Sequence, residues 1–283
     1  MHGSRWDAIN HSCAYDALLT LVYNTSRLYP KMWSALQREN EMLRYFFICL
    51  DAHSAVMSQS TRSALEMTRE DLRNMISLRH PDLFHRHGSK PTDIVSLVGK
   101  MGCMTGPTGI FRVYACSLCG WSNGEYEPVD SIVLHAPLFQ SEYTAANCSS
   151  TDMLFNALAP AVDAWCPYCR IRLKGAIELA QEPGVLLLVV PTVHSARVKI
   201  DLDAYLTMSG QRHEWSLQGA IYQGNSHFTC QIIDAAGDVW YHDGIETGSH
   251  CAWRGNKQSL NSKGDINSVR NRNVCVLVYR HVT

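Results

Sequence analysis

The sequence predicts an α+β fold, because helix-like and strand-like patterns occupy opposite ends of the chain. Through residue 108 the apolar side chains mostly recur every three to four residues, as on the buried face of a helix. From Gly184 to the end, apolar residues alternate with polar ones or form short runs, as in strands. Two Cys-x-x-Cys pairs lie between these regions, without a repeat or a long linker. We therefore expect one compact unit.

Composition argues against several classes of protein. The 283 residues, 46% hydrophobic and 18% charged, are those of a folded globular chain. The net charge of −1 offers no basic surface for nucleic acid. The longest strongly apolar run, residues 185–190, is too short to span a bilayer, and the opening MHGSRWD is no secretory signal. We expect a monomer inside the cell, in cytoplasm or nucleus, that binds neither membrane nor nucleic acid.

Helical patterns follow one another in the first part of the chain. Residues 30–54 keep one apolar side, which predicts helix there. Thr68 and Asp71 have the spacing of a capping box, so a helix is expected to begin at that point. Another is expected over residues 91–102, where a Pro-Thr pair precedes apolar residues and glycines follow.

The stretch from Trp6 to Asn24 places one cysteine at the start of a helix. The apolar residues after Cys13 keep the spacing of one buried face, so the helix begins near Ser12, whose hydroxyl can cap it. A thiol there lies among unpaired N–H groups at the positive end of the helix dipole, which favours the thiolate. Cys13 is therefore a candidate nucleophile. The alternative, which is commoner for a free cysteine, is a small buried residue at a helix start.

A nucleophilic cysteine needs a base and a group that orients the base. Among thirteen histidines, His227 is favoured because it starts a strand after a glycine-containing turn. Asp243 follows one hairpin later, so antiparallel pairing can return its carboxylate beside His227. His11, on the loop before Cys13, lacks such a carboxylate partner. Taken alone, a histidine in the position of His227 is more often an ordinary residue at the end of a strand.

The two Cys-x-x-Cys pairs predict a metal site. Cys116 and Cys119 follow strand-like residues, and Cys166 and Cys169 form the second pair. Together they make the four thiolates of a structural zinc site. The stretch between the pairs is longer than in a compact zinc ribbon, so four unrelated thiols or a redox pair are the alternatives.

Taken together, these positions resemble the ubiquitin-specific proteases, a papain-like family of cysteine peptidases with a thumb, fingers and a palm. The resemblance covers almost the whole chain, because EPVDSIVLHAP, VLLLVV, VKIDLDAYL, WSLQGAIYQGNSHF and VCVLVYR look like family landmarks in the right order. It implies a papain-like cysteine protease fold in a single catalytic domain, residues 1–283. A helical thumb would span 1–108, zinc-knuckle fingers 109–182 and a β-rich palm 183–283.

The residues around Cys13 look closer to a divergent branch, typified by the ubiquitin-specific-protease-like SUMO isopeptidase. In that branch a Trp precedes the cysteine by seven residues and an Asp follows it by three. Trp6 and Asp16 occupy these two positions.

The sequence also departs from the family pattern around the cysteine and the histidine. The usual Asn five residues before the cysteine, an oxyanion donor, is Ala8 here, so Asn10, His11 or the backbone N–H of Cys13 must do that work. The usual Gly before the histidine is Ser226.

Two further departures concern the orienter and the thumb. The segment WYHDG is one residue shorter than the common form, so Asp234 or Asp238 could replace Asp243 if Asp243 points away. The Gln-rich box of the thumb is not plainly present, although DIVSLV, from Asp93, sits where its helix belongs.

The resemblance implies a cysteine isopeptidase that removes ubiquitin or a ubiquitin-like modifier from lysine by hydrolysis after the terminal Gly-Gly. Cys13 would be the nucleophile, His227 the base and Asp243 its orienter. One structural Zn²⁺ per chain is implied, and conjugates of ubiquitin or of a modifier such as SUMO are the implied partners. The zinc ligands would be Cys116, Cys119, Cys166 and Cys169. One alternative is a SUMO-specific isopeptidase. The other is a modifier-binding module of the same fold that has lost turnover, which is suggested by Ala8 in place of the usual oxyanion donor.

Overall fold

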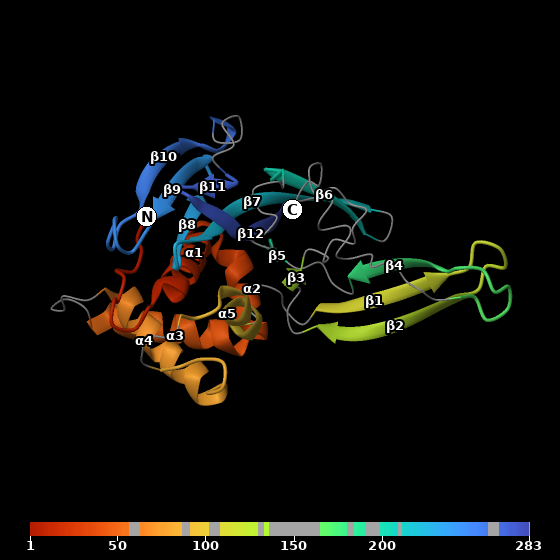
Figure 1. Cartoon of the computed structure of the whole chain (residues 1–283), viewed down its shortest axis with the longest axis horizontal. Helices are drawn as coiled ribbons and strands as arrows, with labels where there is room; N and C mark the ends of the chain where they lie inside the picture. Colours follow the sequence, from red (N-terminus) through yellow and green to blue (C-terminus); the bar gives the residue numbers. More distant parts are fainter. Residues whose placement is uncertain are drawn as a thin grey trace.

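A computed structural model gives the arrangement of the chain. It describes residues 1–56, 63–86, 91–101, 108–129, 133–135, 165–179, 184–190, 199–208, 211–259 and 266–282. A helical body packs against a central sheet, and a smaller sheet projects away from both (Figure 1). This arrangement confirms the predicted α+β class. Over the described ranges, no helix combines the length and the apolar character that crossing a membrane requires.

The helical body begins with the helix that carries Cys13. Its members are α1 (Cys13–Leu28), α2 (Pro30–Glu39), α3 (Glu41–Val56), α4 (Ala64–Arg79) and α5 (Ile94–Met101). The helical segment predicted over residues 30–54 is interrupted, because Asn40 adopts an extended conformation between α2 and α3. The Asn40 side chain accepts a hydrogen bond from the Leu43 N–H at 2.9 Å and so caps α3.

Two predicted helix starts were wrong. The capping box of α4 is formed by Ser63 and Glu66, whereas Thr68 lies inside the helix and donates its hydroxyl to the Ala64 carbonyl. The short helix α5 begins at Ile94 rather than at residue 91, because the Asp93 carboxylate accepts from the Ser96 N–H at 2.8 Å. Both errors have one cause, since each segment offers several capping side chains and tertiary packing selects one.

Two sheets carry the strands. The central sheet has nine strands, in the order β10-β9-β8-β7-β12-β5-β3, with β6 on β7 and β11 on β12, and the smaller sheet has the order β2-β1-β4. Apart from the parallel pair of β3 and β5, the neighbours are antiparallel. The strands are β1 (Thr108–Ala115), β2 (Ser122–Val129), β3 (Val133–His135), β4 (Lys174–Leu179), β5 (Val185–Val189), β6 (Asp203–Met208), β7 (Gln211–Gly224), β8 (His227–Ile233), β9 (Asp238–His242), β10 (Ala252–Asn256), β11 (Ser268–Val269) and β12 (Arg272–Val282).

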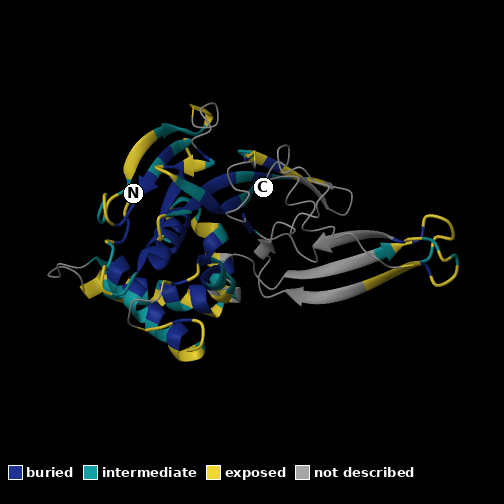
Figure 2. Cartoon of the chain, viewed as in Figure 1, coloured by how far each residue is buried: buried dark blue, intermediate teal, exposed yellow. Residues whose placement is uncertain are grey.

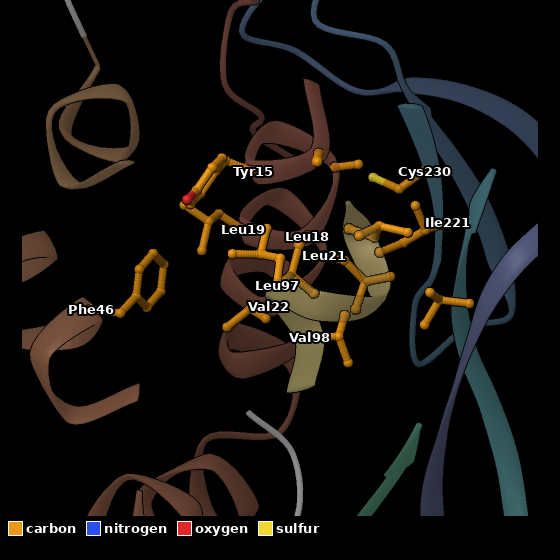
Figure 3. Close-up of a cluster of buried hydrophobic side chains, with 14 of the residues drawn as sticks. Tyr15, Leu18, Leu19, Leu21, Val22, Phe46, Leu97, Val98, Ile221 and Cys230 are labelled. Atoms are coloured by element: carbon orange, nitrogen blue, oxygen red, sulfur yellow. The ribbon is translucent and has the colours of Figure 1, made fainter. Parts of the chain in front are cut away.

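Helix α1 lies at the centre of the largest hydrophobic cluster. Its Leu18, Leu21 and Val22 are fully buried and face side chains from α3, α5, β7 and β8 (Figure 3). A side chain at Gly219 of β7 would collide with the Gln231 carbonyl, at 2.5 Å, and would crowd Leu21 of α1, at 3.0 Å. Glycine therefore lets α1 lie close to the sheet, which fixes Cys13 relative to β8. Figure 2 shows the resulting belt of buried residues through the helices and the central strands.

Candidate active site

Cys13 is the first residue of α1 and is 5% exposed. Ser12 occupies the cap position, but its side chain makes no capping hydrogen bond, so the predicted cap was wrong. The Ser12 hydroxyl instead accepts from the Asp7 N–H at 2.8 Å and donates to an Asp16 carboxylate oxygen at 2.7 Å. The N–H groups in the first turn of a helix have no intrahelical partner. Cys13 is thus at the helix end where these N–H groups and the helix dipole favour a negative charge on its sulfur.

The β8–β9 hairpin brings Asp243 to His227. His227 is the first residue of β8, and Asp243 directly follows β9, which pairs with β8 through Cys230 opposite His242. The His227 Nε2 lies 2.9 Å from Asp243 Oδ1, and Asp243 has no exposed surface. This contact leaves Nδ1 as the ring nitrogen available to the Cys13 thiol, whose interaction with His227 helps to raise the pKa of the imidazole.

The electrostatics of this group favour a charged imidazole. Burial opposes protonation of the ring, but the hydrogen bond with Asp243 and the interaction with Cys13 outweigh it and raise the pKa of His227 to about 9. Burial likewise opposes ionisation of Asp243, but the hydrogen bonds from His227 and the Ile245 N–H hold the pKa of that carboxyl below its ordinary value. At neutral pH the pair is therefore an imidazolium beside a carboxylate.

Tyr241 and Arg272 hold the second oxygen of Asp243. The Tyr241 hydroxyl donates to Oδ2 at 3.1 Å, and the Arg272 guanidinium lies 3.5 Å from the same oxygen. Sequence reasoning missed both residues. Tyr241 lies two residues before Asp243, so the alternation of side chains along the strand could have pointed to it. Arg272 comes from β12 and left no local signal in the sequence.

The structure does not bring the alternative orienters to His227. The Asp234 carboxylate accepts hydrogen bonds from the Ala236 and Asp238 N–H groups and from the Trp240 indole. These bonds hold the Asp234 side chain in the turn between β8 and β9. Asp238 lies opposite Asn256 at the far end of β9.

The two oxyanion candidates lie on the loop before Cys13. One N–H of the Asn10 amide is committed to Asp7, with Nδ2 at 2.8 Å from Oδ2. His11 is half-buried and adopts a positive φ of 48°. Ala8 is exposed on the same loop and offers no side-chain donor. The loop thus contains donors next to the cysteine, although one Asn10 N–H is already used.

Trp6 is packed against the histidine. The two rings stand edge to face, with centroids 6.1 Å apart and an interplanar angle of 78°. The Trp6 N–H donates to the Gly244 carbonyl at 3.2 Å, and a side chain at Gly244 would come within 2.7 Å of the Trp6 nitrogen. Glycine after Asp243 therefore lets the first residues of the chain lie against the hairpin.

The four cysteines meet at the tip of the small sheet. Cys116 and Cys119 lie in the turn between β1 and β2, and Cys166 and Cys169 lie in the turn before β4 (Figure 1). Their sulfur atoms all fall within 4.8 Å of one another. The Cys119 N–H lowers the pKa of the Cys116 thiol to about 7, which favours the thiolate that a metal binds.

The two cysteine turns have matching backbones. The Gly120 N–H donates to the Cys116 carbonyl, and the Arg170 N–H donates to the Cys166 carbonyl, at 3.0 and 2.9 Å. Both donors adopt positive φ, 73° and 56°. Each turn therefore points its sulfurs toward the other pair, and this all-thiolate donor set fits one tetrahedral zinc ion.

Comparisons with known proteins place this geometry in context. No family model matches the chain, and no curated protein matches it. Solved structures do match, and one is the SAGA DUB module Ubp8/Sgf11/Sus1/Sgf73 bound to monoubiquitin, with a TM-score of 0.62 and 10% identity over 100% of this chain and 69% of that one. The chain has the fold of a ubiquitin-specific protease.

Two further structures agree. The same module bound to ubiquitin aldehyde matches with a TM-score of 0.61 and 10% identity, over 100% of this chain and 70% of that one. The yeast SAGA module with an Sgf73 mutant matches at 0.57 and 11%, over 100% and 69%. These matches support the predicted fold, but they give no support to the expected closer likeness to the SUMO isopeptidase. At such identity the likeness concerns the fold and not the roles of residues.

Proposed function

We propose that the protein is a thiol isopeptidase that removes ubiquitin from lysine side chains by hydrolysis after the terminal Gly-Gly. The observation that carries the proposal is the arrangement of His227, which pairs with Asp243 through Nε2 and interacts with Cys13 at the start of a helix. This is the nucleophile, base and orienter that acyl transfer requires. The shared fold with a ubiquitin-bound module supports ubiquitin as the modifier.

The first half of the reaction forms a thioester. The Cys13 sulfur, held as a thiolate beside the His227 imidazolium, attacks the carbonyl carbon of the terminal glycine. The carbonyl oxygen becomes an oxyanion, which the Cys13 N–H stabilises together with Asn10 or His11. Collapse of this intermediate breaks the bond to the lysine nitrogen, and His227 gives its proton to the departing amine.

The second half releases the modifier. Neutral His227 takes a proton from a water molecule as that water attacks the thioester carbon. The sulfur then leaves and recovers its ion pair with the imidazolium, and the modifier departs with a free glycine carboxylate. Asp243 keeps the ring in one orientation throughout, with Tyr241 and Arg272 holding its second oxygen.

The fingers serve binding in this proposal. A zinc ion on Cys116, Cys119, Cys166 and Cys169 would supply a rigid link between the two turns. The tip of the small sheet lies far from α1, the helix that carries Cys13 (Figure 1). The small sheet then grips the folded body of the modifier. The Gly-Gly tail enters between thumb and palm, where residues without side chains fit best.

The proposal includes a single catalytic domain with a thumb of 1–108, fingers of 109–182 and a palm of 183–283, acting as a monomer. It also includes an intracellular location, in cytoplasm or nucleus. None of the cysteines that the structure describes forms a disulfide, which is the state that reducing compartments maintain.

Two alternatives have their own observations. Trp6 and Asp16 occupy the positions of the Trp and Asp in the SUMO isopeptidase pattern, and both lie at the site. Trp6 packs against His227, and Asp16 lies beside Ser12. This favours SUMO as a second candidate modifier. Ala8, in place of a side-chain oxyanion donor, favours a binding module with weak or no turnover.

A panel of modifiers with C-terminal electrophiles tests the proposal. Ubiquitin, SUMO and NEDD8 probes are incubated with the protein, and intact mass reports any covalent adduct. We expect capture of the ubiquitin probe in the wild type and none in Cys13→Ala. Capture of the SUMO probe alone would move the proposal to the SUMO isopeptidase, and the absence of every adduct would favour the binding module.

A further inference from the structure

A buried ion pair lies next to the loop that precedes Cys13, without a part in the chemistry above. Asp16 of α1 and Arg69 of α4 are 2% and 5% exposed, and Asp16 Oδ1 lies 2.6 Å from Arg69 Nη1. Burial raises the pKa of the Asp16 carboxyl to about 6, although Arg69 and Ser12 act in the opposite direction. Burying two charges costs much of what their attraction returns. Overall stability is therefore a weak reason for this pair, and its geometry offers a better one.

Helix α4 holds the first end of the loop through the same arginine. Arg69 Nη1 donates to the Arg5 carbonyl at 2.7 Å, in addition to Asp16. Glu66, one helical turn earlier, accepts from the Arg5 N–H at 3.0 Å. Glu66 is itself fixed as a member of the capping box of α4. The backbone of Arg5 is therefore held at both its N–H and its carbonyl by side chains from one helix.

Asp16 holds the other end of the loop. Its Oδ2 accepts from the Ser12 hydroxyl at 2.7 Å, and that hydroxyl accepts from the Asp7 N–H at 2.8 Å. Ser12 has no exposed surface and directly precedes Cys13. One carboxylate and one guanidinium thus connect both ends of the segment 5–12 to α1 and α4.

Trp6 lies between these two anchors and touches the other half of the site. Its ring stands against His227, and its N–H donates to Gly244, the residue after Asp243. The anchored segment therefore bridges the thumb, which supplies Cys13, and the palm, which supplies His227 and Asp243. A shift of this segment would change the approach of sulfur and imidazole together.

We infer that the Asp16–Arg69 pair is a positioning device that sets Cys13 against His227 by anchoring the segment 5–12. Neither side chain touches the reacting atoms, so both are positioning residues. Arg69 also pairs with Glu70, at 2.9 Å, which orients the guanidinium from its other side. The inference rests on the proposed roles of Cys13 and His227, but it does not depend on which modifier is cleaved.

Alkylation of Cys13 tests the inference without a modifier. Asp16→Asn removes the charge and Arg69→Lys removes the guanidinium fork that reaches Asp16 and Arg5 together. The rate at which an uncharged haloacetamide labels Cys13 is followed by peptide mass between pH 6 and pH 10. We expect both variants to be labelled at least tenfold more slowly than wild type at pH 7, and within about twofold of it at pH 10, where free thiols ionise without help.

Arg79→Lys is the matched control, because Arg79 makes a similar two-nitrogen contact with Glu41 from the same helix but on an exposed surface. It should be labelled at the wild-type rate at every pH. Folded Asp16→Asn and Arg69→Lys proteins labelled at the wild-type rate at pH 7 would overturn the inference and leave the pair as a structural anchor of α4 on α1.

Ser12→Ala decides the question if those variants do not fold, because it keeps the ion pair and removes only its link to the loop. We expect slower labelling at pH 7, and unchanged labelling would again overturn the inference. The panel of modifier probes tests the proposed function independently of these labelling rates. Slow labelling of these variants without capture of any modifier would refute the proposed function alone, whereas modifier capture with unchanged labelling would refute the positioning role alone.

Discussion

The active site and the fingertip are held together by different means. Cys13 comes from α1, and His227 and Asp243 come from the β8–β9 hairpin. Helix α1 and strand β8 share a large apolar core (Figure 3). Buried hydrogen bonds join the polar residues of the site. Around the four cysteines of the fingertip, the described buried residues form a small cluster of Cys116, Cys166 and Leu173. Leu118, Trp165 and Tyr168 at the same tip are exposed.

This difference predicts that the active site and the fingertip serve different steps, the site the chemistry and the fingertip the binding of the modifier. A cluster of this size cannot fix two turns by apolar burial, whereas metal binding in small modules contributes on the order of 10 kcal/mol to folding. The geometry of the active site is fixed by packing and hydrogen bonds. Changes at the site should therefore affect turnover, and changes at the fingertip should affect capture of the modifier.

The largest effect is expected from the nucleophile and its base. Cys13→Ala and His227→Ala should lower the turnover of an isopeptide-linked ubiquitin substrate by about 10⁴-fold or more, because residues that act as a unit lose most of the rate together. Cys13 and His227 are each the first residue of their element, so melting temperatures should stay within about 5 °C of wild type. Turnover that survives Cys13→Ala would remove Cys13 from the mechanism.

A smaller loss is expected at the orienter. Asp243→Asn keeps the shape of the side chain but weakens its hold on the imidazolium, so kcat should fall by about 10²-fold or more, within the range of acid–base effects. Asp234→Asn is the matched control, because Asp234 holds only its own turn and Trp240. If the control lost as much activity as Asp243→Asn, the orienter would be Asp234.

The fingertip should respond in binding rather than in chemistry. Elemental analysis should find about one zinc per chain in the wild type and none in Cys166→Ser. In Cys166→Ser, affinity for ubiquitin, measured in a Cys13→Ala background, should fall about tenfold, or about 1.4 kcal/mol. With Cys13 intact, kcat of Cys166→Ser should be nearly unchanged. Cys49→Ser, at a half-buried thiol of α3, should change neither value. An active wild-type protein with no metal and four free thiols at the tip would contradict the zinc assignment.

The smallest effect near neutrality is expected from pH. The folded pKa of His227, about 9, lies above the ordinary value of 6.5. The stability that its ion pair contributes is therefore fully present below about pH 6.5 and is lost as pH rises through 9, and the ring stays mostly charged up to about pH 8. The rate of probe capture should therefore be flat from pH 7 to 8 and then decline through pH 9. In Asp243→Asn the decline should begin at lower pH, because the main source of the raised pKa is weakened. A decline centred near pH 6.5 in the wild type would contradict the charged pair.

The sequence could predict what is local along the chain. A cysteine at a helix start, a histidine and an aspartate on one hairpin, and two cysteine turns each depend on neighbours within a few residues or on one strand pairing. The break at Asn40 and the capping box at Ser63 were missed because several side chains can cap each helix and packing chooses among them.

The predicted cap of Ser12 failed for a tertiary reason. The Ser12 hydroxyl is drawn to Asp16 and Asp7, and Asp16 is in turn held by Arg69, a residue 53 positions away in the chain. Arg272 reaches Asp243 from another distant strand. Charged residues with no periodic pattern carry no sign of such partners, so the groups that support the site had to be seen in the structure.

The most direct test of the central claim is cleavage of a ubiquitin–lysine isopeptide by the wild-type protein. Intact mass would follow a peptide that carries ubiquitin on one lysine. The account predicts free ubiquitin ending in a Gly-Gly carboxylate and the peptide with its lysine amine restored, both lost in Cys13→Ala. Tight binding of the conjugate with no cleavage at any enzyme concentration would contradict it and would identify a binding module.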